Sequence, residues 1–108
     1  MGAGMEIHIE NIERFINHPG LPEFYLTMSP LANPAHLGAE EYRRWLWNRI
    51  KPRDGRRGDE YNAIGYLARL NKRTEVILLT HEDDPEWVNV VIAAVRWYQA
   101  EYLREKRA

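Results

Sequence analysis

The sequence predicts an α/β fold: a small single domain with a three-stranded, at least partly parallel sheet and about three helices, in the order β-β-α-α-β-α. Three observations predict it. Apolar and polar residues alternate near the N-terminus, apolar residues recur at helical spacing in three later stretches, and the apolar run 76–79 follows two of those stretches. A strand that follows helices rather than a tight turn is typical of parallel pairing.

Length and composition indicate one folded domain. The chain has 108 residues, 44% of them hydrophobic, with four tryptophans and six tyrosines, which is typical of a protein with a buried core. We assign residues 5–108 to a single α/β domain, and residues 1–4 to a non-native remnant or a flexible N-terminus. The formal charge of −1 gives no overall attraction to nucleic acid, which is the least favoured partner.

The absence of cysteine limits the covalent links, nucleophiles and metal ligands that the protein can use. It excludes disulfides, thiolate nucleophiles and cysteine-ligated metals, and the four histidines show no ligand spacing, so no metal site is expected. No apolar run is long enough to cross a membrane, and the N-terminus lacks the apolar core of a signal peptide. We therefore expect a cytoplasmic protein without a membrane partner. The sequence leaves open whether it is an enzyme, and it indicates no particular cofactor.

Two strands are predicted before residue 29. Met5, Ile7 and Ile9 alternate with polar residues, which is typical of a half-buried strand. Residues 17–22 are rich in Asn, Pro and Gly and predict a turn. A second alternation over residues 24–28 predicts another strand, which leads directly into a proline-bounded loop.

Two helices are predicted in the middle of the chain. The first covers residues 40–50, where one stripe is apolar: Tyr42, Trp45, Leu46 and Ile50. Asp59 is expected to cap the second, which covers about residues 60–72 and has Ile64, Leu67 and Ala68 facing inward. Gly65 weakens this second helix by roughly 1 kcal/mol relative to alanine.

A buried strand and a long helix follow. Residues 76–79 are all apolar and flanked by charges, which favours a strand buried on both faces. Asp83 or Asp84 is the expected N-cap of the last helix, with Pro85 at its first position. That helix is expected to end near Arg104, with this inner face: Val88, Val91, Ile92, Val95, Tyr98 and Tyr102.

The loop 29–34 reads Ser-Pro-Leu-Ala-Asn-Pro and lies between a predicted strand and a predicted helix. Its two prolines fix φ and hold Ser29 and Asn33 in extended conformations. In α/β proteins, ligand contacts often lie in such loops. Ser29 and Asn33 are therefore candidate ligand-binding residues; the alternative is that both side chains close the loop on itself.

This loop, followed by Tyr-Arg-Arg-Trp-Leu at residues 42–46, resembles the domain of unknown function 4326 family of bacteria and phages. The family motif reads Ser-Pro-Leu-Gly-Asn-Pro and then Tyr-Arg-x-Trp-Leu, so Ala32 replaces its glycine. The resemblance extends from about Met5 to Tyr98. It implies a fold and the position of a site, but no reaction.

The chain departs from the family at the end of the last strand. The family typically carries Cys-x-Cys-x-x-x-Pro-Cys-His there, and alignment on Pro85 puts Leu79, His81 and Glu86 at the cysteines and Trp87 at the histidine. The resemblance therefore indicates a divergent member without the family's Cys/His motif, in which the thiols and soft metal ligands at this position are missing.

The acidic turn after the third strand is a second candidate site. His81, Glu82 and Asp84 lie with Asp83 and Glu86 at the end of the apolar run, where open parallel sheets form a crevice. A histidine beside carboxylates could act as a general base, and the acids could hold a hard cation. The alternative is that the acids only cap the helix and favour its dipole.

Residues 51–58 form a basic, glycine-containing loop. Arg53, Arg56 and Arg57, together with Lys51, could contact phosphates; the alternative is an ordinary solvated loop. Trp45 and Trp47 lie about 200° apart on a helix, so both cannot face inward, and a similar argument separates Trp97 from Val95. Trp47 and Trp97 are therefore candidate interface residues, with a satellite of the core as the alternative.

These observations favour a protein that binds a small, nucleotide-like ligand at the carboxyl ends of the strands, between Ser29, Asn33, His81 and the basic loop. The alternative is a non-catalytic phage-type or host-modulating protein that uses its tryptophans to bind a protein partner or a second copy of itself. The missing Cys/His motif favours this alternative.

Overall fold

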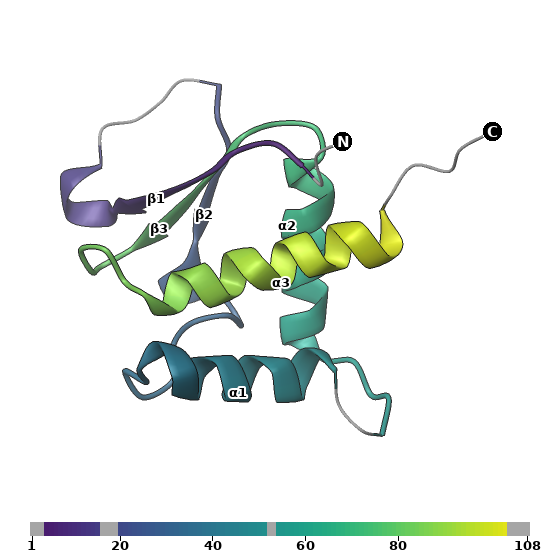
Figure 1. Ribbon diagram of the computed structural model, residues 1–108. Helices are drawn as coiled ribbons and strands as arrows, with labels where there is room; N and C mark the ends of the chain where they lie inside the picture. Colours follow the sequence, from purple (N-terminus) through teal and green to yellow (C-terminus); the bar gives the residue numbers. More distant parts are fainter. Residues whose placement is uncertain (1–3, 16–19, 52–53, 104–108) are drawn as a thin grey trace.

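The computed structural model describes residues 4–15, 20–51 and 54–103, and it confirms the predicted α/β class. The strands β1 (Ile7–Asn11), β2 (Glu23–Tyr25) and β3 (Val76–Thr80) form one sheet in the order β1-β3-β2. The helices α1 (Ala39–Ile50), α2 (Asp59–Asn71) and α3 (Trp87–Tyr102) pack against one another beside the sheet (Figure 1). Two short 3-10 helices, η1 (Ile12–Arg14) and η2 (Leu26–Met28), follow β1 and β2.

Both strand pairs are parallel, with β3 in the centre. Ile7 pairs with Val76 on one side, and Glu23 pairs with Ile77 on the other. Every residue of β3 is buried, which confirms the prediction of a strand covered on both faces. The carboxyl ends of all three strands therefore lie at one edge of the sheet.

The helices close the core through most of the apolar stripes that the sequence predicts; the exception is Tyr102, which is predicted on the inner face of the last helix but is 47% exposed. Tyr42, Leu46 and Ile50 of α1 are at most 2% exposed, and Trp45 and Trp47 flank this stripe as half-buried residues. From α3, Val88, Val91 and Val95 are fully buried against them. Among the described residues, no helix is long and apolar enough to cross a membrane.

Gly65 is explained by the close approach of α2 and α3. A Cβ atom at this position would lie 3.0 Å from both the Cζ and the hydroxyl oxygen of Tyr98. The glycine costs helix stability locally but lets the buried Tyr98 ring lie directly against α2.

The second strand is shorter than the predicted 24–28. β2 ends at Tyr25, and the chain turns into η2, where Leu26 is fully buried and Met28 is 84% exposed. The turn forms because the backbone N–H and the hydroxyl of Ser29 both donate to the Leu26 carbonyl, at 3.2 and 2.9 Å. The hydrogen bonds of Ser29 thus end β2 earlier than the alternation of apolar and polar residues predicts.

The predicted helix caps are wrong in detail. α3 begins at Trp87 with Glu86 as its N-cap, and neither Asp83 nor Asp84 caps it. Asp84 instead has φ +43°, a left-handed conformation that an N-cap does not have. In α2 the N-cap is Gly58, and Asp59 is the first helical residue, where its charge still favours the helix dipole.

Candidate functional site

The Ser29–Pro34 loop uses both of its candidate side chains to bond its own backbone. The Ser29 hydroxyl donates to the Leu26 carbonyl and accepts from the Leu31 N–H at 3.1 Å. The Asn33 side chain donates to the Leu37 carbonyl and accepts from the Leu37 N–H, both at 2.7 Å. Their predicted role toward a ligand stays a prediction, and their observed role is to fix the loop.

Tyr42 anchors the same loop to α1. Its hydroxyl donates to the Leu31 carbonyl at 2.6 Å, and both side chains are fully buried. Burial, followed by the negative charge of Glu60, raises the pKa of Tyr42 well above its ordinary value. Tyr42 is therefore a neutral hydrogen-bond donor that holds the loop against α1.

The turn after β3 is built by Thr80 and extended to β1 by Asp83. The Thr80 hydroxyl accepts from the Glu82 N–H at 3.2 Å, and the Glu82 carboxylate accepts from the indole N–H of the buried Trp87 at 2.9 Å. Asp83 accepts from the Asn11 side chain at 3.0 Å and pairs with Arg14 at 3.1 Å. Asp84 and His81 are exposed.

A hollow of about 280 Å³ lies at this carboxyl edge, between β1 and the turn. It is lined by Ile9, Glu10, Asn11, Arg14, Glu82, Asp83 and Asp84. Four carboxylates face one arginine, which is already paired with Asp83, so the hollow repels phosphate. Neither Ser29, Asn33 nor His81 lines it.

The basic loop lies at the other end of α1 from the Ser29–Pro34 loop (Figure 1). The 12 residues of α1 separate the two loops by about 18 Å of helix. Arg53 lies outside the described residues. Arg56 is exposed and bonds Asp54 locally, whereas the Arg57 guanidinium lies 4.8 Å from the centre of the Tyr61 ring. The structure thus places the described basic residues away from the Ser29–Pro34 loop.

Trp47 and Trp97 contact each other across α1 and α3. Their ring centres are 5.3 Å apart in an edge-to-face arrangement, and both side chains are half-buried against the core. Both interpretations of the sequence, an interface and a satellite of the core, are compatible with half-burial. The interface role therefore stays a prediction.

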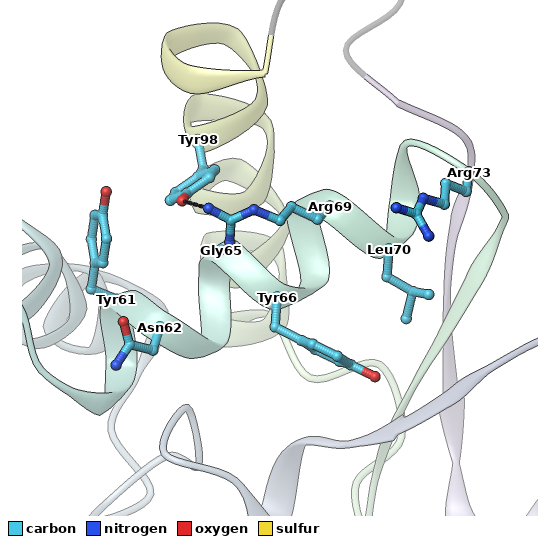
Figure 2. A pocket seen from close by; sticks show the side chains of 8 residues that line it. All are labelled: Tyr61, Asn62, Gly65, Tyr66, Arg69, Leu70, Arg73 and Tyr98. Carbon is cyan, nitrogen blue, oxygen red and sulfur yellow. Dashed lines mark hydrogen bonds between the residues drawn. The ribbon is translucent and has the colours of Figure 1, made fainter.

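A larger hollow, of about 410 Å³, lies along α2 beside α3 (Figure 2). We call it the tyrosine–arginine pocket; it is lined by Tyr61, Asn62, Gly65, Tyr66, Arg69, Leu70, Arg73 and Tyr98. Seven of these residues come from α2 and the turn after it, at spacings of three and four that place them along one side of the helix. Tyr98 reaches the pocket from α3, over the gap that Gly65 leaves.

The pocket has an excess of positive charge. The Arg69 guanidinium donates to the Tyr98 hydroxyl at 2.8 Å and lies 5.3 Å from the centre of that ring. Within the described part of the chain, neither Arg69 nor Arg73 forms an ion pair, and no carboxylate lines the pocket. Both cations are therefore left to interact with solvent or an anion.

Tyrosines form the wall at one end of the pocket. The Tyr61 ring lies 5.5 Å from Tyr98 and 6.3 Å from Tyr102, measured between ring centres. Desolvation and the neighbouring phenols raise the pKa of Tyr61 from 10.0 to about 12, which disfavours its ionised form. Tyr66, at the opposite side, is 56% exposed and packs against Phe24 at 6.1 Å.

Sequence reasoning missed this pocket, although part of it was visible. Tyr66, Arg69 and Arg73 follow helical spacing on the side of α2 opposite the buried Ile64 and Leu67, and an aromatic and basic outer stripe is a signal in itself. Tyr98 lines the pocket only because α3 packs against α2, and no pattern within one segment of the sequence predicts this.

Comparisons with known proteins add no relative. The chain matches no family model, no curated protein and no solved structure. The resemblance of residues 29–46 to the domain of unknown function 4326 family therefore stays a prediction, and functional argument rests on the geometry described above.

Proposed function

We propose that the protein binds a small anionic ligand with a planar ring, of the nucleotide class, in the tyrosine–arginine pocket. The observation that carries the proposal is a hollow of about 410 Å³ that combines exposed aromatic surface with two arginines and no carboxylate. Its volume is in the range usual for sites that bind small molecules, roughly 300–1,000 Å³.

The two arginines provide the anion-binding half of this site. Arg69 lies in the last turn of α2, and Arg73 follows four residues later in the turn after the helix, so both line the same pocket. A guanidinium presents several N–H donors in a planar fork that suits phosphate. Arg69 uses one of these donors in its described hydrogen bond to the Tyr98 hydroxyl. A phosphate bound between them would neutralise charge that the pocket leaves uncompensated.

Tyr66 and Asn62 provide the other half. The exposed ring of Tyr66 offers a face on which a planar base can stack, an interaction worth about 1–3 kcal/mol for bases on aromatic residues. Asn62 lies one helical turn earlier and carries an amide that both donates and accepts. These groups suit a ligand with a polar, planar ring attached to an anion.

The carboxyl edge of the sheet is less suited to the same ligand. Its hollow is acidic, and the side chains of Ser29 and Asn33 are already engaged with their own loop. A phosphate there would meet the carboxylates of Glu82, Asp83 and Asp84. The proposed function therefore keeps the ligand class that the sequence predicts but moves it to α2.

A thermal-shift titration of the full chain tests this proposal, because a ligand that binds only the folded state raises Tm. Adenosine 5′-monophosphate should raise Tm more than adenosine or inorganic phosphate, since only it offers both ring and anion. Arg73→Met should abolish most of this ligand-induced rise, whereas Arg44→Met, an exposed arginine on α1, should leave it unchanged. Equal rises in both variants, or no rise with any ringed anion tested, would reject the proposal.

One observation favours a second function, association with a protein partner or a second copy. Trp47 lines an open groove of about 500 Å³ between α1 and α3, together with Arg43, Glu86, Asn89 and Val90. If this groove is an interface, light scattering should show a mass above that of one chain, and Trp47→Ala should reduce it. If the protein is a monomer at every concentration measured, the groove is not an interface between two copies of this chain.

A further inference from the structure

Beyond the proposed function and independently of it, we propose that Glu6, His8 and Glu75 form a binding site for a divalent transition-metal ion of the zinc class. One ligand atom from each of the three side chains lies within 4.8 Å of the other two. The site is at the amino end of β1 and β3, at the opposite end of these strands from the acidic turn.

The backbone holds the three residues together. Glu6 directly precedes β1, two residues before His8, which places both on the same face. Glu75 directly precedes β3, and the pairing of Ile7 with Val76 brings it beside Glu6. The Val76 N–H donates to the Glu6 carbonyl at 3.2 Å, and the Asn71 side chain donates to the same carbonyl at 3.2 Å. The sheet therefore fixes the backbone positions of Glu6 and Glu75 beside each other.

His8 lies between the two carboxylates. Its Nε2 is 2.7 Å from Oε1 of Glu75, and its Nδ1 is 3.7 Å from Oε2 of Glu6. Both ring nitrogens thus face oxygen ligands, so a metal ion bound by one nitrogen can take a carboxylate oxygen after a small side-chain rotation. Because one ligand atom of each side chain lies within 4.8 Å of the other two, one ring nitrogen and one oxygen from each carboxylate can reach a single ion.

The cluster lacks positive charge. Like charges side by side on neighbouring strands are destabilising. Among the described residues, the only ion pairs of Glu6 and Glu75 are those with His8, and no lysine or arginine compensates them. The two carboxylates therefore concentrate negative charge, which a divalent cation would neutralise.

The ligand set selects the class of metal. One imidazole and two carboxylates suit Zn²⁺ and its first-row neighbours, whereas Ca²⁺ and Mg²⁺ prefer oxygen ligands alone. The side chains of Glu6, His8 and Glu75 are 72%, 32% and 41% exposed, so an ion can reach them from solvent. Three protein ligands would leave a coordination position for water.

Calorimetric titration of the full chain with Zn²⁺ near neutral pH tests this site. We expect one strong equivalent per chain, with an affinity that falls in His8→Gln and in Glu75→Gln by more than the roughly 10–100-fold that loss of a ligand's hydrogen-bond partner costs, since each variant removes a direct ligand. His36→Gln is the matched control because His36 is an exposed histidine outside the cluster, and it should bind as the unchanged chain does. The imidazole NMR signals of His8 should shift on addition of one equivalent, ahead of those of the other histidines.

Absence of Zn²⁺ uptake by the unchanged chain would overturn the proposal, as would unchanged affinity in both His8→Gln and Glu75→Gln. If His8→Gln does not fold, the double variant Glu6→Gln/Glu75→Gln decides the question, because it retains the histidine and removes both carboxylates. Retained strong binding in that variant would also overturn the site.

Discussion

The Arg69 guanidinium donates a hydrogen bond to the Tyr98 hydroxyl at 2.8 Å and thereby joins the outer side of α2 to α3. The same guanidinium lies over the Tyr98 ring, at 5.3 Å from its centre. This contact fixes the orientation of one cation of the tyrosine–arginine pocket. It depends in turn on Gly65, which leaves room for the ring.

Gly65→Ala should lower the free energy of unfolding by roughly 1 kcal/mol. Alanine improves helix propensity by about 1 kcal/mol, but its Cβ would lie 3.0 Å from the buried Tyr98 ring, and overpacking of this kind costs about 1–3 kcal/mol. Urea denaturation measures the change. Asn62→Ala, an exposed position on the same helix, also improves propensity and should cause no loss; a stabilised Gly65→Ala variant would contradict the packing argument.

Asn33→Ala should destabilise the fold by about 1–3 kcal/mol, because it leaves the N–H and carbonyl of Leu37 without their described partners. Chemical denaturation of this variant, with the exposed Asn48→Ala as the control, gives the value. The ligand-induced rise in Tm should be unchanged in Asn33→Ala. A stable variant that has lost ligand binding would instead support the predicted role of Asn33 as a ligand contact.

Tyr42→Phe should cost about 1–3 kcal/mol, since it removes the donor to the buried Leu31 carbonyl while retaining the ring in the core. Tyr66→Phe is the matched control, because Tyr66 is 56% exposed and no described hydrogen bond involves its hydroxyl. Equal stability of the two variants in urea would show that the bond between Tyr42 and Leu31 contributes little.

Stability should fall at alkaline pH. The pKa values of Tyr42 and Tyr61 are raised in the folded state from an ordinary 10.0, that of Tyr61 to about 12. Above pH 10 the unfolded chain therefore loses these protons first, so their contribution is fully present below pH 10 and is lost as the pH rises toward the folded values. The urea midpoint should fall less steeply above pH 10 in Tyr42→Phe and Tyr61→Phe; identical slopes would contradict the shifts.

Much of the fold follows from local pattern. The stripe Tyr42–Leu46–Ile50 and the run Val76–Leu79 predict α1 and β3 correctly, because burial of apolar side chains decides both elements. The errors occur where polar side chains bond the backbone locally. Ser29 ends the second strand early, and Thr80 with Asp83 builds a turn that delays α3 to Trp87.

The candidate sites were less predictable because they depend on contacts between distant segments. His8 and Glu75 are 67 residues apart and meet only through the register of β1 and β3. Arg69 and Tyr98 meet because two helices cross at a glycine. The sequence shows which residue types are present, but the packing of elements decides which of them become neighbours.

The most direct test of the ligand proposal is an NMR titration of the ¹⁵N-labelled chain with adenosine 5′-monophosphate, followed through backbone amide shifts. The proposal predicts saturable shifts centred on Asn62, Tyr66, Arg69 and Arg73, with the amides of Thr80–Asp84 and of the Ser29–Pro34 loop unaffected. Shifts centred on the Thr80–Asp84 turn, or no saturable shifts along α2, would contradict a nucleotide-class site in the tyrosine–arginine pocket.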